Sequence, residues 1–159
     1  MALQPTTSQP QIPPHIVYQL TTTEIVSSGI PASDVVEAGQ DVTFHLVGEV
    51  VGALPLVAWM ANQPVAIKVH VERVEGPWTA RKTFGPWVTT TSAPTPTPAG
   101  TKVWFTFTSP ALTTVAGGDL PLAPHDDDAV YRVTVEAHFQ AVKSDVAFAE
   151  GLLMVTAAP

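Results

Sequence analysis

Three consecutive aspartates are the side chains in this sequence that most resemble a metal site. Asp126, Asp127 and Asp128 follow His125, directly before an apolar, strand-like run. Carboxylate oxygens in a loop suit Ca²⁺, but consecutive residues do not all point inward, so other loops would have to supply ligands. The spacing also matches no EF-hand. The alternative is a solvated loop in which Asp127 or Asp128 accepts hydrogen bonds from backbone amides. We favour that loop and expect no metal.

Residues for covalent or acid–base catalysis do not form a recognisable arrangement. The chain has no cysteine and no Gly-x-Ser-x-Gly turn around a nucleophile. None of its serines stands in a context that a His and an Asp would complete. Nothing about its glutamates suggests two carboxylates across a cleft, and no glycine-rich phosphate-binding loop is present. We therefore expect a protein that is not an enzyme and needs no cofactor.

Aromatic side chains in the middle of the chain are the candidates for binding. Trp78 and Trp87 each follow a Gly-Pro pair, which places them at strand starts or loop tips, and Trp104 stands in a later strand. Exposed aromatic rings are apolar platforms for sugars or protein partners; otherwise such rings cap the core. Arg81 and Lys82 form an adjacent basic pair that would attract an acidic partner. Trp78, Arg81, Lys82 and Trp87 are thus the predicted partner-binding residues.

The composition excludes some partners and favours others. The chain has 159 residues, a net charge of -7 and only 7 lysines and arginines, so it offers no basic surface for nucleic acid or anionic lipid. No segment contains the roughly 18 apolar residues of a spanning helix, so we expect no membrane insertion. Hydrophobic residues make up 45% and charged residues 13%. This balance predicts exposed apolar surface that a protein partner or self-assembly would cover.

The chain divides into an N-terminal arm and one domain. Residues 1–14 are rich in Pro, Thr, Ser and Gln and have little to bury, so we expect an extended arm. Residues 15–159 form one domain, large enough to bury a core without disulfides. Within it, residues 89–100 are a Thr/Pro-rich loop inserted as a hairpin. The first residues do not resemble an export signal, which predicts cytoplasmic synthesis. A removed leader is an open alternative, so the localisation stays unassigned.

Alternation of apolar and polar residues predicts strands along the domain. It places Val42, Phe44 and Leu46 on one side of an early strand, and Val133 and Val135 on one side of a late one. Other strands are expected at residues 15–26 in two pieces, 56–60, 64–74, 102–108 and 148–155.

This pattern resembles an immunoglobulin-like (Ig-like) domain of the variable or intermediate kind. The run from Asp127 to Val133 is similar to the D-x-A-x-Y-x-C start of strand F, with Tyr131 as the tyrosine and Val133 in place of the cysteine. Leu46 stands where strand B would have its cysteine, and Trp59 follows 13 positions later, like the core tryptophan of strand C. The resemblance implies an all-β, antiparallel two-sheet Ig-like sandwich with Greek-key connections and no core disulfide. Its fold-defining residues would be Leu46, Trp59, Tyr131 and Val133.

The same layout bears on three histidines. By alternation, His45, His70 and His138 face outward on strands B, C′ and F. Imidazoles from neighbouring strands can ligate a transition metal. In the Ig layout, however, strand B lies in the opposite sheet from C and F. The three rings are therefore not expected to converge, and His70 with His138 is at best a weak pair.

Three functions fit these observations. We favour a non-enzymatic structural or interaction protein, an Ig-like subunit that decorates or joins a larger assembly such as a virion, shell or filament. The second is a carbohydrate-binding or adhesin module that uses Trp78, Trp87 and Trp104. The third is a Ca²⁺-stabilised extracellular binding domain. The fold by itself does not choose among them, because function depends on the site.

Overall fold

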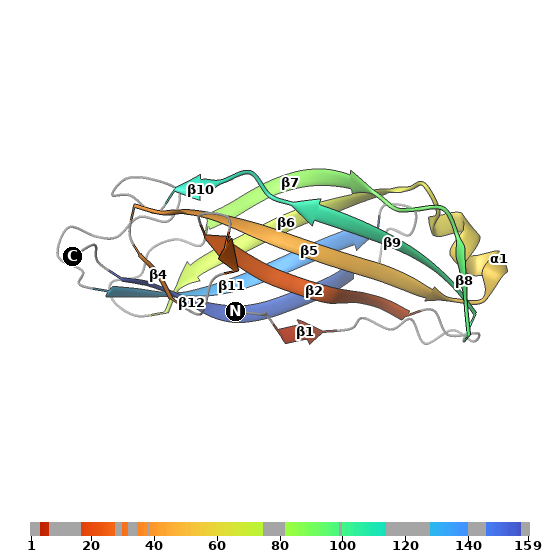
Figure 1. The fold of residues 1–159 in the computed structure, drawn as a ribbon, viewed down its shortest axis with the longest axis horizontal. Coiled ribbons are helices and arrows are strands. Elements are labelled where there is room, and N and C mark those ends of the chain that lie inside the picture. Colours follow the sequence, from red (N-terminus) through yellow and green to blue (C-terminus); the bar gives the residue numbers. More distant parts are fainter. Residues whose placement is uncertain are drawn as a thin grey trace.

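Strands make up most of the chain that the computed structural model describes, and they form two facing sheets (Figure 1). The described residues are 4–6, 17–27, 30–31, 35–37, 39–74, 82–98, 100–113, 128–139 and 146–156. Within them, every strand pairing is antiparallel except that of β4 with β12. The fold is an all-β sandwich of two sheets, as the alternating pattern predicts.

The first sheet has β5 (Asp41–Gly52) at its centre, with β2 (Val17–Ser27) on one side and β9 (Gly100–Thr108) on the other. Three short strands complete it: β3 (Ile30–Pro31) beside β2, β8 (Thr95–Thr97) beside β9, and β10 (Leu112–Thr113) beside β5. The two expected pieces of the first strand form one strand, β2. Its pairing with β5 is irregular between Leu20 and Thr22. The Thr/Pro-rich segment supplies β8, which forms a hairpin with β9.

The second sheet has β11 (Asp128–Phe139) between β12 (Val146–Thr156) and β6 (Pro64–Arg73). Beyond β6 lies β7 (Lys82–Thr90), and beyond β12 lie two short strands, β1 (Gln4–Thr6) and β4 (Val35–Glu37). The strand β1 belongs to the predicted N-terminal arm. The chain crosses between the sheets from β5 to β6, returns after β7, and crosses again to β11.

Inward-facing residues of the alternating strands fill the core between the sheets. Leu46 and Val133, the positions predicted to replace cysteines, are fully buried, and Tyr131 is buried as well. Phe105 of β9 meets Phe139 of β11 edge to face, with ring centroids 5.7 Å apart. Aromatic and aliphatic packing of this kind stabilises the sandwich without a disulfide.

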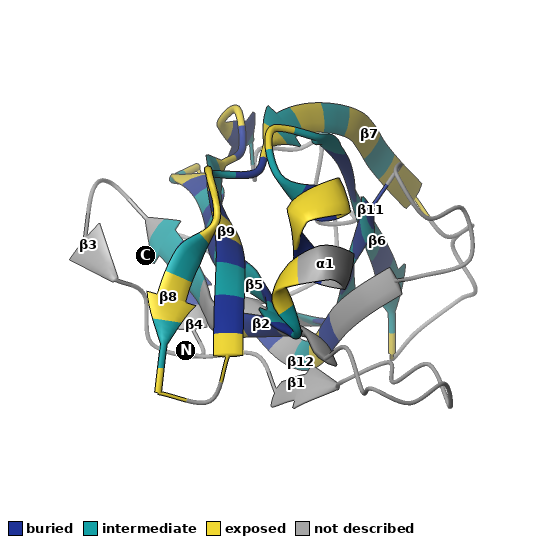
Figure 2. Ribbon diagram, turned by 90° about the vertical axis from the view of Figure 1, so that its right-hand side faces the viewer, coloured by how far each residue is buried: buried dark blue, intermediate teal, exposed yellow. Residues whose placement is uncertain are grey.

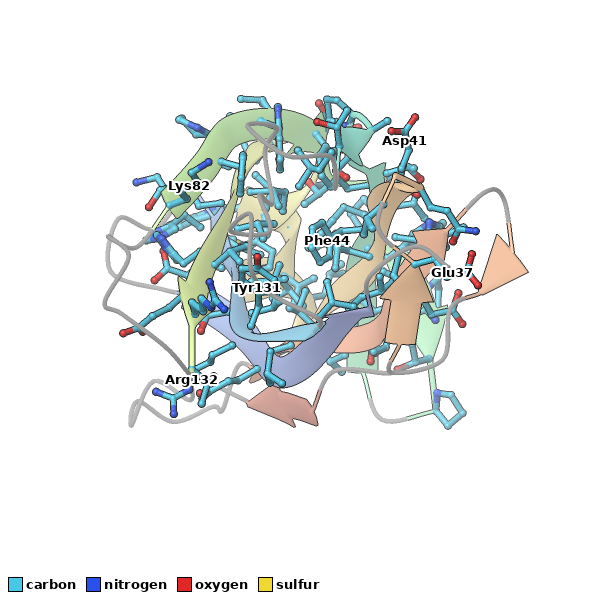
Figure 3. All side chains as sticks on the ribbon, turned by 90° about the vertical axis from the view of Figure 1, so that its left-hand side faces the viewer. Glu37, Asp41, Phe44, Lys82, Tyr131 and Arg132 are labelled. Carbon is cyan, nitrogen blue, oxygen red and sulfur yellow. The ribbon has the colours of Figure 1, made fainter. Side chains whose placement is uncertain are left out.

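Figure 3 shows the same division between interior and surface from one end of the molecule. Phe44 and Tyr131 lie between the sheets, and the charged residues lie around the outside: Glu37, Asp41, Lys82 and Arg132. Gly48 of β5 also faces the core, where a Cβ atom would lie 2.3 Å from the ring of Phe105. The ring of Phe105 therefore occupies the space that a side chain at position 48 would need.

Two short helical turns occur where the sequence predicted a strand with a core tryptophan. The helix α1 (Leu54–Val57) follows β5, and the 3₁₀ turn η1 (Ala58–Met60) leads towards β6. The prediction for Trp59 is wrong, because Trp59 lies in η1 with 75% of its surface exposed. Val57 and Met60 stand three positions apart, a spacing that puts both on one helical face, and both are buried. A proline in the first turn of α1 favours this helical start over a strand.

Candidate interaction surface

Two large apolar side chains are exposed at one end of the sandwich. Leu54 of α1 is 57% exposed and Trp59 of η1 is 75% exposed. We call these two residues the Trp59 end. Figure 2 looks onto this end of the molecule and shows exposed segments of α1 and of the turn that follows it in front of the two sheets. Apolar residues that gather at one place on a surface are characteristic of contact sites for partners.

Buried neighbours hold the Trp59 end in place. Val57 and Met60 anchor the helical turns in the core, and Thr91, which follows β7, is buried beside them. The hydroxyl of Thr91 donates a hydrogen bond to the carbonyl oxygen of Met60 and accepts one of 2.9 Å from the amide of Gln63. The amide of Thr91 in turn donates to the carbonyl oxygen of Gln63 at 2.9 Å. The backbone that carries Trp59 is therefore fixed from both sides.

A second tryptophan is connected to the same region through Ser92. The amide of Asn62 donates a hydrogen bond to the carbonyl oxygen of Ser92 at 3.2 Å. The amide of Ser92 donates one to the carbonyl oxygen of Trp104 at 2.7 Å. The amide of Trp104 donates to Oγ of Ser92 at 3.0 Å. Trp104 faces outward from β9 and is 37% exposed, with Nζ of Lys102 5.8 Å from its ring centroid. This geometry is that of a cation–π contact.

Two of the four predicted partner-binding residues lie in the part of the chain that the structure describes. Trp78 and Arg81 lie outside the described residues, and Lys82 is exposed at the start of β7. Trp87 lies within β7, and its ring stacks on Phe107 with centroids 5.6 Å apart and is packed against the core. The expected strand start or loop tip is therefore wrong for Trp87, whose ring caps the core.

The local reason for the position of Trp87 is the backbone before it. Gly85 has a φ of 91°, and a Cβ atom there would lie 2.5 Å from the carbonyl oxygen of Ile67. The pairing of β6 with β7 is irregular between Ile67 and Val69. The strand therefore continues through Gly85 and Pro86 where the sequence indicated a turn.

The exposed pair Leu54 and Trp59 did not emerge from the sequence. The signal that could have revealed it is the proline after Leu54 together with the three-residue spacing of Val57 and Met60, both of which favour a helical turn.

The weak calcium candidates remain without a described site. Asp126 and Asp127 lie outside the described residues, and Asp128 is the first residue of β11, opposite Thr156. Among the side chains that the structure describes, no group of three or more His, Asp or Glu has the spacing to hold a metal ion. The described part of the chain also contains no helix long and apolar enough to cross a membrane.

Comparisons with known proteins give little further information. No protein-family model matches the chain, and no curated protein matches it at a significant level. Among solved structures, the chain is similar to the C-terminal domain of Wzt at 10% sequence identity and a TM-score of 0.42. The match covers 99% of this chain and 81% of that one. At these values the similarity assigns neither a family nor a function.

Proposed function

We propose that this protein is a non-enzymatic interaction subunit, an Ig-like sandwich that decorates or joins a larger assembly such as a virion, shell or filament. The contact that we assign to it is the Trp59 end. The observation that carries the proposal is the exposure of Trp59, 75%, and of Leu54, 57%, on turns whose other residues are anchored in the core.

The physical argument combines exposure with rigidity. Tryptophan is enriched among the residues that dominate protein interfaces, where its truncation costs about 2 kcal/mol or more. Ordering a flexible surface segment on binding reduces affinity. The hydrogen bonds of Thr91 and the burial of Met60 fix the backbone of η1 in advance. Trp59 can therefore be buried against a partner without the cost of ordering the turn that carries it.

The order of the strands supports the Ig-like part of the proposal. In one sheet β2, β5 and β9 take the places of strands A, B and E, and in the other β12, β11, β6 and β7 take those of G, F, C and C′. Leu46 of β5 and Val133 of β11 are fully buried at the two positions expected for cysteines. Trp59 does not support the Ig-like assignment. It lies in the turn before β6 and not within β6, the strand that takes the place of strand C.

Light scattering during size exclusion, over a range of protein concentrations, tests the proposed assembly. The full chain and a chain that starts at His15 are compared with the double variant Leu54→Ser/Trp59→Ser. We expect the full chain to form oligomers or to retain a stoichiometric partner from native cells. The double variant should lose this association. Val74→Ser is the matched control, since Val74 is 46% exposed just after the far end of β6 and should leave assembly unchanged. A monomer at every concentration, with no partner retained through Trp59, would contradict the proposal.

A carbohydrate-binding function is the second candidate, and one observation favours it. Trp104 presents part of its ring on the outer face of the first sheet beside Lys102, a combination of aromatic surface and polar neighbour that suits a sugar. Trp87 no longer contributes, because its ring packs on Phe107. Glycan-array binding that Trp104→Ala abolishes and Trp87→Ala leaves intact would favour this function over the assembly subunit.

A further inference from the structure

Two histidines meet one carboxylate on the outer face of the second sheet. Nε2 of His70 on β6 lies 3.0 Å from Oε2 of Glu136 on β11, and Nε2 of His138 lies 3.3 Å from the same oxygen. The register explains the contact: His70 stands opposite Thr134, and Glu136 and His138 follow on the same face of β11. The two histidines, a weak pair by sequence alone, are thus joined through Glu136, which the alternation places on the same side of its strand as His138.

The orientation of His70 is fixed by its second ring nitrogen. Nδ1 of His70 lies 2.8 Å from the hydroxyl of Thr83 on β7, and the side chain of His70 is only 13% exposed. Nε2 of His70 is buried and lies 3.0 Å from the carboxylate without a regular hydrogen bond to it, so we treat the contact as an ion pair. A bare nitrogen lone pair facing an ionised carboxylate would be repulsive, so Nε2 has to carry a proton. In the neutral ring protonated at Nε2, Nδ1 accepts from the hydroxyl of Thr83, and in the imidazolium Nδ1 donates to it; the imidazolium in addition forms an ion pair with Glu136.

The charged groups around this cluster are nearly balanced. On the described outer face, β6 contributes Lys68 opposite Glu136, and Glu72 opposite Arg132 of β11. From β12, Glu150 pairs with Arg132, with 3.4 Å between Oε1 and Nε. From β7 the cluster is faced by the uncharged Thr83, and the nearest charged residue of that strand is Lys82.

The net charge of this face therefore depends on the two imidazoles. Lys68 and Arg132 are positive and Glu72, Glu136 and Glu150 are negative, which gives a net charge of -1 when both histidines are neutral. Protonation of both changes it to +1. The sign of the charge on this face therefore depends on whether the two imidazoles carry a proton.

We propose that His70, Glu136 and His138 form a proton-responsive clasp between β6 and β11. When both rings are protonated, one carboxylate faces an imidazolium from each strand, and the face carries a positive charge. When both rings are neutral, the clasp has no charge pairing and the face is negative. The clasp is a switch in the outer face of the second sheet and does not depend on the function proposed for the Trp59 end.

The electrostatics of Glu136 fit this arrangement. Burial disfavours the ionised carboxyl, but the contacts with His70 and His138 and their positive charges outweigh it and hold the pKa of Glu136 below its usual 4.5. The carboxylate is therefore ionised throughout the pH range in which imidazoles change charge.

A double-mutant cycle at two pH values tests the clasp. Unfolding equilibria are measured for the full chain and for H70Q, E136Q and H70Q/E136Q, at pH 5.5 and pH 7.5. Because the ion pair requires a protonated ring and acid favours protonation, we expect a coupling factor in the unfolding constant of about three- to tenfold at pH 5.5 and about one- to twofold at pH 7.5.

His45 provides the matched control. Its Nδ1 lies 3.1 Å from the hydroxyl of Thr108 on a neighbouring strand, a contact of the same kind as that of His70 with Thr83 at 2.8 Å. Glu24 stands opposite His45 on β2, but the described side chains show no ion pair for His45. H45Q should therefore show no comparable dependence on pH. Equal coupling at both pH values, or an equal effect of H45Q, would overturn the proposal. If E136Q does not fold, the pH dependence of H70Q and H138Q relative to H45Q tests the clasp in its place.

Discussion

Trp59 and Met60 are neighbours in the sequence, but the structure predicts a small loss of stability when Trp59 is truncated and a large loss when Met60 is. A tryptophan hides roughly 150–250 Å² when fully packed, and Trp59 is 75% exposed. About 40–60 Å² of Trp59 is then buried, which corresponds to roughly 1–1.5 kcal/mol at about 25 cal/mol per Å². This value is an upper estimate, because the unfolded chain also buries some of that surface. We expect Trp59→Ala to reduce the free energy of unfolding by about 1 kcal/mol or less.

Met60→Ala should cost much more. Met60 is fully buried in the core, and truncation of such a residue to alanine removes its packing and leaves a cavity, at about 2–5 kcal/mol. Both variants are measured by urea denaturation, with the slope of the transition compared to confirm that each unfolds in two states. Fluorescence adds a second readout, since an exposed indole emits at longer wavelength than a buried one.

The opposite ranking would refute the placement of the helical turns. A core tryptophan on a strand, as the sequence predicted, would make Trp59→Ala cost about 3–5 kcal/mol. A loss of that size, together with a small effect of Met60→Ala, would mean that residues 54–60 present their other face to the core. The Trp59 end would then not exist, and the proposed contact would fail with it.

Four further predictions concern the packing and the charges. Thr91→Val should cost about 1–3 kcal/mol in unfolding experiments, since it leaves buried partners at Met60 and Gln63 unsatisfied; the exposed Thr90→Val is the control, and equal effects would contradict the role of Thr91. Gly48→Ala should cost about 1–3 kcal/mol, because its Cβ would meet the ring of Phe105, and an unchanged melting temperature would be evidence against this packing. Glu136→Gln should lower stability above about pH 4.5, the usual pKa of the carboxyl, with the difference from the unmodified chain disappearing as pH falls through the lowered pKa; a difference that persists at pH 2 would contradict the sign. If Asp126, Asp127 and Asp128 hold Ca²⁺, a chelator should lower the melting temperature, and a melting temperature insensitive to it would remove the calcium hypothesis.

The strands of the core could be predicted because alternation is local. In β5, β6 and β11 every second residue is apolar, and these residues are the buried ones. A one-residue shift would turn each set to solvent, so the pattern determines the inward face of each strand without knowledge of its neighbours.

The site depended on information that alternation does not contain. The position of Trp59 was inferred from its separation from Leu46, which counts residues and ignores the conformation between them. The contact of His70 with Glu136 depends on the register between β6 and β11, which places His70 opposite Thr134. Neither strand specifies that register alone. Trp87 was misplaced because Gly85 and Pro86, which usually indicate a turn, lie within a continuous strand.

Trp59, which the sequence placed in the core, is also the residue on which the proposed contact depends. The core is filled without Trp59, because Phe44, Phe105 and Phe139 are fully buried and Met60 occupies the inner face of η1. The backbone of η1 is held by Thr91 and by Met60, so the indole of Trp59 is not needed to maintain it. A serine at position 59 would satisfy the fold nearly as well. A large apolar ring that the packing of the chain does not require is the physical basis of the contact that we propose for Trp59.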